Sequence, residues 1–163
     1  MNFKTSASSA IIFTLLISCS STQIVLDDFI FDEQSLPKDC KIIKPTEDEP
    51  LPFNIPDNPY VSSDTSFTNL ARLLLNTDEL NSSIERGLFS VYQCKNEIGI
   101  NGIKFKTIKD AEKCEKIIKA AITDTTRFSV FRNMNIVIHL WRDDVTDSCY
   151  DDFSRMIRDR LNL

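Results

Sequence analysis

The amino-acid sequence predicts an α+β domain in which a four-stranded antiparallel sheet carries helices on one face. From Thr65 onward, the spacing of apolar residues switches between two, which is typical of strands, and three to four, which is typical of amphipathic helices. These patterns follow the order β-β-α-β-β-α, a common α+β layout. All six prolines lie between residues 37 and 59, and all three glycines between residues 87 and 102. After an N-terminal leader (1–18), the chain therefore divides into an arm (19–64) and a domain (65–163).

The arm is acidic and interrupted by prolines, most densely over residues 47–52. Because proline neither continues a helix nor donates to a central strand, we expect loops and polyproline-like segments there, with edge strands near residues 24–31 and 40–43. The arm is too rich in aromatic and aliphatic residues to be a disordered linker. We therefore expect much of it to lie over the surface of the domain.

Two short helices are predicted at the start of the domain. Apolar residues repeat at i, i+3, i+4 and i+7 over residues 66–76, which indicates one face of a helix. A second short helix is expected directly afterwards, with Leu80 and Ile84 facing inward. Gly87 is expected to end it, because glycine is common just after the last turn of a helix.

A β-hairpin is predicted next. The run 88–94 is rich in aromatic and β-branched residues and reads as a strand, and 100–107 reads as its return strand. Lys95-Asn96-Glu97 is the expected turn. The Asn101-Gly102 pair is the stronger local turn signal. We interpret it instead as a bulge, because a turn there would join a strand of about a dozen residues to one of about five.

The rest of the domain follows a helix, hairpin, helix order. A helix from residue 108 to 122 lines one face with apolar side chains and carries lysines and acids on the other. Strands over 127–131 and 135–141 form a second hairpin, and residues 149–161 form the last helix. No repeat is present in the sequence.

The N-terminus has the organisation of a signal peptide. Lys4 precedes an uncharged apolar run over residues 10–17, which is too short to span a bilayer because a spanning helix needs about 20 apolar residues. The run ends in Leu16-Ile17-Ser18-Cys19, which resembles the lipobox of bacterial lipoproteins. An ordinary secretory signal, cut after Ser18 or Ser20, is the alternative.

The resemblance covers only about the first 19 residues, and it implies a lipid-anchored protein of the bacterial cell envelope. In such proteins the chain is cleaved before the cysteine, here Cys19, whose sulfur then carries diacylglycerol. Two or three acyl chains anchor a protein stably, whereas one does not. Ser20, in place of an aspartate, favours the outer membrane facing the periplasm if the host has two membranes.

The cysteine count agrees with this address. The chain has five cysteines, so assigning Cys19 to lipid leaves an even set of four. An even set in an oxidising compartment predicts two disulfides. A zinc site is disfavoured because no C-x2-C or C-x4-C spacing exists and the chain has a single histidine. Of the three possible connectivities, the order of elements favours Cys94–Cys149, which leaves Cys40 to pair with Cys114.

The sequence predicts neither catalysis nor a cofactor. His139 is the only histidine, no G-x-S-x-G motif is present, and the three glycines form no phosphate-binding loop. Without Lys4, the chain after residue 18 has 19 − 1 = 18 basic and 24 acidic residues, a net charge of −6. That charge argues against nucleic acid as a partner, because nucleic-acid binding requires basic patches.

One face of the predicted sheet is the candidate binding face. Strand alternation, with helices on the opposite side, places aromatic and cationic side chains together there: Phe89, Lys104, Lys106, His139 and Trp141. Such a mixture suits recognition of a protein or a small ligand. The alternative is that the proline-rich arm, or the helix around Leu70, covers this face.

Together these observations favour a non-catalytic envelope lipoprotein that acts as a structural or protein-interaction module. Its expected partners are the membrane, through the lipid, and another envelope or secreted protein. The alternative is an inhibitor or immunity lipoprotein that neutralises an enzyme attacking the envelope, for which the small size, acidity and lipid anchor are also suitable.

Overall fold

The structure is a computed structural model that describes residues 24–46, 50–51, 55–63, 75 and 78–163. The leader, Cys19 and, apart from Leu75, the helix predicted over residues 66–76 lie outside the described residues.

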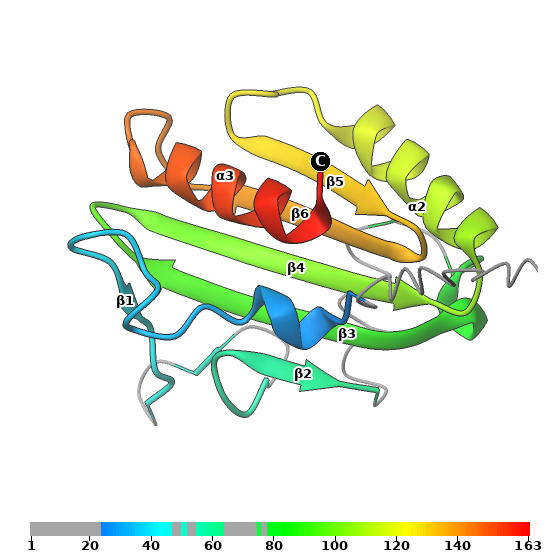
Figure 1. The fold of residues 1–163 in the computed structure, drawn as a ribbon, viewed down its shortest axis with the longest axis horizontal. Coiled ribbons are helices and arrows are strands. Elements are labelled where there is room, and N and C mark those ends of the chain that lie inside the picture. Colours follow the sequence, from blue (N-terminus) through cyan, green and yellow to red (C-terminus); the bar gives the residue numbers. More distant parts are fainter. Residues whose placement is uncertain (1–23, 47–49, 52–54, 64–74, 76–77) are drawn as a thin grey trace, which may run out of the picture.

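The described part of the chain is α+β, as predicted, with a six-stranded antiparallel sheet in place of four strands (Figure 1). Its elements, in chain order, are η1 (Leu26–Phe29), β1 (Lys41–Ile42), β2 (Tyr60–Ser62), η3 (Asn81–Ser83), β3 (Ile84–Gln93), β4 (Glu97–Phe105), α2 (Ile108–Ala121), β5 (Phe128–Asn133), β6 (Ile136–Arg142) and α3 (Cys149–Leu161).

The sheet has the strand order β1-β3-β4-β6-β5, and β2 also pairs with β3. The four strands expected from the sequence are β3 to β6, although their bounds differ by a few residues: β4 begins at Glu97, the last residue of the predicted turn. The two additional strands are short segments of the arm, and both lie along the outer edge of β3. The arm therefore extends the sheet as well as covering it, which hides an edge that would otherwise be open to other chains.

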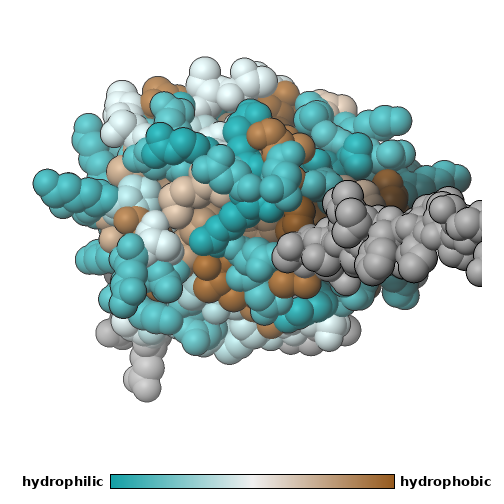
Figure 2. All heavy atoms as spheres, viewed as in Figure 1, coloured by the Kyte–Doolittle hydropathy of each residue, from teal (hydrophilic) through white to brown (hydrophobic). Residues whose placement is uncertain are grey.

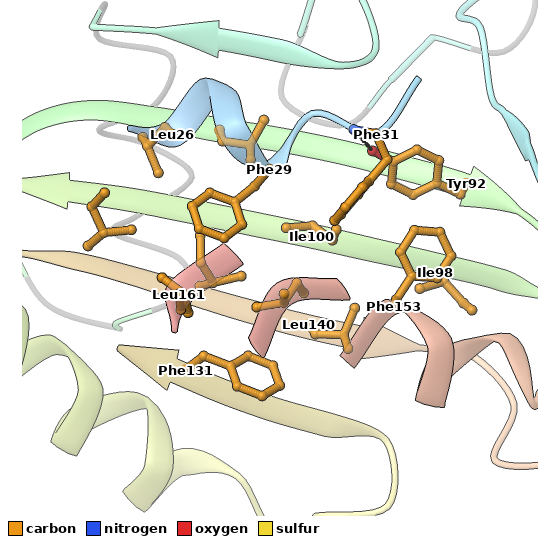
Figure 3. Close-up of a cluster of buried hydrophobic side chains, with 14 of the residues drawn as sticks. Leu26, Phe29, Phe31, Tyr92, Ile98, Ile100, Phe131, Leu140, Phe153 and Leu161 are labelled. Carbon is orange, nitrogen blue, oxygen red and sulfur yellow. Dashed lines mark hydrogen bonds between the residues drawn. The ribbon is translucent and has the colours of Figure 1, made fainter. Parts of the chain in front are cut away.

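The first layer on the sheet consists of α3 and η1, which lie in front of the strands in Figure 1. Buried side chains from both elements meet the strands in a single apolar cluster (Figure 3). The ring of Phe153 in α3 lies 5.6 Å from that of Phe31 and 4.9 Å from that of Tyr92, measured between centroids. The backbone N–H of Phe31 donates to the Tyr92 hydroxyl at 3.3 Å. The first described segment of the arm is thus part of the core.

Helix α2 lies on the opposite face, which corrects the expectation of helices on one side. Its buried residues Ala111, Cys114 and Ile118 pack with Ile103 and Val137. These two strand residues are direct cross-strand partners, and Val137 stands between Ile136 and Ile138, which belong to the cluster that packs with α3. Because side chains alternate between the faces of a strand, α2 and α3 must cover opposite faces.

The helix ends show the expected local chemistry. Thr107 is the N-cap of α2, where its hydroxyl accepts the backbone N–H of Asp110 at 3.1 Å and so satisfies one of the free donors of the first turn. Asn162 ends α3 in the left-handed conformation that is typical of a helix C-terminus.

Three other local expectations are wrong. The second short helix is a single 3-10 turn, η3, and Gly87 lies within β3 instead of ending a helix. The Asn101-Gly102 pair lies in regular register with β3, whose one irregularity falls between Ile84 and Arg86. In the arm, the edge strand expected near 24–31 is the 3-10 turn η1, whereas the one expected near 40–43 is confirmed as β1.

Hydrophilic side chains cover most of the face seen in Figure 2, with apolar residues showing between them. Among the described residues, no helix has the length and apolar character that crossing a bilayer requires.

Gly99 provides a test of the packing on the α2 side of the sheet. A Cβ added there would lie 2.1 Å from Cε2 of the Trp141 indole, closer than such atoms approach, so the indole covers the place where a side chain would stand. At Gly102, on the opposite face, the nearest atom to an added Cβ is 3.0 Å away.

We predict that Gly99→Ala displaces the indole and lowers the free energy of unfolding by about 1–3 kcal/mol, the usual cost of overpacking. Trp141 is the only tryptophan, so its emission should shift to the red. Gly102→Ala is the matched control, because it crowds the other face and should leave the emission unchanged. Equal spectra for Gly99→Ala and the unsubstituted chain would contradict this packing.

Candidate functional site

The candidate binding face exists, but the arm covers it. Phe89 and His139 lie on one face of the sheet, because both are cross-strand partners of Asn101. Trp141 shares this face. Phe89 is 4% exposed and His139 is 7% exposed. An apolar cluster formed by Leu51 and Ile55 of the arm packs on this region. The alternative in which the arm covers the face is therefore correct.

The two predicted lysines do not belong to this face. Lys104 pairs with Ile136, which faces α3, and its ammonium forms an ion pair with Glu85 at 2.8 Å. Lys106 lies beyond the end of β4, where its ammonium donates to the backbone carbonyl of Ser82 at 2.7 Å. The prediction failed because β4 begins at Glu97, which fixes a register that places Lys104 on the side opposite Phe89.

His139 lies in an apolar environment. Its ring stacks on Phe128 with centroids 5.6 Å apart and an 11° angle between planes. Nδ1 lies 3.4 Å from the side-chain amide nitrogen of Asn101. Burial lowers the pKa of His139 to about 4, so the imidazole is neutral at pH 7. A shielded imidazole with this pKa is poorly suited to general acid-base catalysis near neutral pH.

Asn58 holds the arm against this face. Its side chain is fully buried, and its amide nitrogen donates to the carbonyls of Ile43 and Val91, at 2.6 Å each. Its amide oxygen accepts the backbone N–H of Val91 at 3.0 Å. One amide thus joins two arm segments to β3. No sequence motif marks this residue, although a polar side chain among prolines and apolar residues is a signal that sequence reasoning missed.

The cysteines differ from both predicted pairs. Cys40 forms a disulfide with Cys94, and Cys114 and Cys149 are free. The pairing follows from β1, whose Lys41 lies opposite Gln93, so that the preceding Cys40 meets the following Cys94. Cys114 is fully buried between α2 and the sheet, where burial raises the pKa of its thiol to about 12.

Cys149 nevertheless lies beside the disulfide. The sulfur atoms of Cys40, Cys94 and Cys149 lie within 4.8 Å of one another. Asp147, which is 2% exposed, fixes this arrangement: its carboxylate accepts the backbone N–H groups of Asn96 at 2.9 Å and of Cys149 at 3.0 Å. Burial, followed by the charge of Asp147, raises the pKa of the Cys149 thiol above its ordinary value.

We call the carboxylate-rich surface around this disulfide the acidic end. Its members are Asp39, Glu97, Asp143, Asp144 and Asp152, which surround the buried carboxylate of Asp147. Burial and then the charge of Asp143 raise the pKa of Glu97. Lys95 and Arg127 lie close enough to act on Asp144, so they offset part of the negative charge. The sequence analysis treated these acids separately and did not predict that they meet.

The neutral state of His139 predicts a pH dependence of stability. Its folded pKa of about 4 lies below its ordinary value of 6.5, so the unfolded chain binds the proton first as the pH falls. The stabilisation is complete above pH 6.5 and is lost as the pH falls toward 4. At about 1.4 kcal/mol per pKa unit, the loss amounts to at most about 3–4 kcal/mol.

His139→Gln should remove this component, because glutamine does not titrate. We expect the unsubstituted chain to lose stability more steeply than the variant between pH 6.5 and 4, as measured by urea unfolding at several pH values. Other titrating groups are common to both proteins and cancel in the difference. Parallel stability curves would show that His139 is accessible to protons in the folded chain.

No family model matches the chain, and no solved structure matches it. Among curated proteins, cardiolipin synthase A of Buchnera aphidicola subsp. Acyrthosiphon pisum is 33% identical over 88 residues, in each of the strains Tuc7, 5A and APS. The alignment covers 51% of this chain but 17% of the synthase. The chain thus spans less than a fifth of the relatives it matches, and the likeness assigns it neither a family nor an activity.

Proposed function

We propose that the chain is a lipid-anchored envelope protein that acts by binding another envelope or secreted protein and not by catalysis. The observation that carries the proposal is the distribution of ionisable groups. Carboxylates gather at the acidic end, whereas the His139 imidazole and the Cys114 thiol are buried. A polar, charged surface whose single imidazole is buried favours recognition over chemistry. A positively charged partner surface is complementary to the acidic end.

The short distance along the chain from Cys19 to the fold supports the same proposal. Four residues lie between Cys19 and Ile24, so the two are at most about 18 Å apart when the chain is fully extended. Ile24 lines a hollow of about 510 Å³ beside the end of α3, together with Arg160 and Asn162. The acidic end lies at the start of α3, and a helix of 13 residues is roughly 20 Å long. An anchor on Cys19 would therefore leave the acidic end directed away from the bilayer.

The anchor is tested first, by mass spectrometry of the chain isolated from its native membrane. We expect the first peptide to begin at Cys19 and to carry diacylglycerol, and Cys19→Ser to release the protein from the membrane fraction. A retained 1–18 leader, or an unmodified Cys19 thiol, would refute the lipid anchor and with it the proposed location.

The binding function is tested by charge reversal at the acidic end. Asp39→Lys together with Asp143→Lys changes two exposed members of the acidic end. Glu112→Lys together with Asp159→Lys is the matched control, because it makes the same change in charge at exposed sites elsewhere. In cross-linking and capture from detergent-solubilised envelopes, we expect the first pair to lower partner recovery at least about tenfold and the control less than twofold.

The identity of the captured protein separates the two functional candidates. A resident envelope component supports the interaction module, whereas a cationic enzyme that degrades the envelope supports the inhibitor alternative. Equal loss in both double variants would refute the acidic end as the interface.

A further inference from the structure

Three sulfur atoms meet at the acidic end, but the disulfide uses only two. Cys40 precedes β1, Cys94 follows β3, and Cys149 is the first residue of α3. Their sulfurs lie within 4.8 Å of one another, and Cys149 carries a free, partly exposed thiol. A thiol next to a disulfide in the same chain is the arrangement that exchange requires, since a thiolate attacks one disulfide sulfur and expels the other.

We propose that Cys149 exchanges with the Cys40–Cys94 disulfide within the folded chain. The Cys149 thiolate attacks Sγ of Cys94, the Cys94–Cys149 bond forms, and the Cys40–Cys94 bond breaks. The electron pair of the broken bond leaves on Sγ of Cys40, which takes up a proton in place of the one lost by Cys149. One disulfide and one thiol are present before and after, so no oxidant or reductant is required.

The surroundings select Cys94 as the sulfur that is attacked. Asp147 binds the backbone of Asn96 and of Cys149, so the segments that carry Cys94 and Cys149 are already held together. The new bond therefore requires little movement of β3 or α3. Cys40 is the better leaving partner, because it directly precedes β1, a short edge strand of two residues.

The consequence of exchange is a looser arm. The Cys40–Cys94 bond is a disulfide cross-link between the arm and β3 of the sheet. After exchange, the part of the arm that follows Cys40 is held by β1, by β2 and by the hydrogen bonds of Asn58. Leu51 and Ile55 of this arm cover Phe89 and Trp141. The disulfide thus helps to hold in place the arm segment that covers an apolar face of the sheet.

The surroundings of Cys149 determine the pH at which the exchange becomes fast. Burial disfavours the Cys149 thiolate most, followed by the carboxylates of Asp147 in the loop before α3, Asp152 within α3 and Asp39 on the arm. Because only the thiolate attacks, exchange should be slow at pH 7 and should accelerate about tenfold per pH unit below the thiol pKa.

The experiment follows the location of the free thiol in the full chain. The protein is held without reductant between pH 7 and 10, quenched in acid, alkylated and mapped by mass spectrometry without reduction. We expect the label to move from Cys149 to Cys40 as the pH rises, and a linked Cys94–Cys149 peptide to appear. The rate should not depend on protein concentration. A label that stays on Cys149 at every pH, or a rate that rises with concentration, would overturn the proposal.

Three variants complete the test. Cys149→Ser should abolish labelling of Cys40, whereas Cys114→Ser should change nothing, because Cys114 is buried on the other face of the sheet. Cys19→Ser removes the one further thiol of the full chain, so exchange in that variant is independent of whether Cys19 carries lipid. Labelling of Cys40 in Cys149→Ser would refute the role of Cys149.

Cys40→Ser traps the product directly. We expect it to fold with a Cys94–Cys149 disulfide and to show faster quenching of Trp141 fluorescence by acrylamide than the unsubstituted chain. If Cys94 and Cys149 both remain open to alkylation in this variant, the two sulfurs do not react and the proposal fails.

Discussion

A sheet whose central strands are apolar on both faces needs a cover on each face, and this constraint shapes the whole molecule. Ile100 and Leu140 point to one side of the sheet, and Ile103 and Val137 to the other. The two long helices each protect one side, but neither covers its face completely. The arm supplies what is missing: η1 beside α3, and Leu51 with Ile55 beyond α2. The arm therefore contributes to the core just as the helices do.

The same constraint determines which chemistry remains at the surface. Closing both faces buries His139 and Cys114, whose pKa values move to about 4 and about 12 because the charged forms lose their hydration. Among the described residues, the exposed carboxylates of Asp39 and Asp143 at the acidic end and the partly exposed Cys149 thiol remain accessible. Recognition of a charged partner and disulfide exchange are both compatible with such a surface, and both occur where the arm is fastened to the sheet.

Much of the C-terminal half was predictable because its signals are local. The β3–β4 hairpin, the helix α2 and the terminal helix α3 each follow from periodicity and turn chemistry over a few residues, although β4 begins at Glu97, within the predicted turn. The two-sided burial was also visible in principle, since residues 136–141 form an almost continuous apolar run, which is typical of a strand covered on both faces. Assuming helices on one face led to the expectation of an open binding face.

The contacts that were not predictable join distant segments. Cys40 pairs with Cys94 because β1 lies beside β3, and no local pattern specifies that neighbour. Topology did place Cys94 and Cys149 at the same end of the fold, which the proximity of their sulfurs confirms, although they are not bonded. Asn58, Asp147 and the register that separates Lys104 from His139 likewise depend on tertiary contacts across more than 30 residues.

Native-state hydrogen exchange tests most directly whether the arm is an integral layer of the fold. The amide of Val91, which donates to the Asn58 side chain, reports on the arm, and amides between β4 and β6 report on the centre of the sheet. If the arm is part of the core, both should exchange with the free energy and denaturant dependence of global unfolding. Exchange of Val91 through a low-energy local opening, while the β4–β6 amides remain protected, would contradict this account.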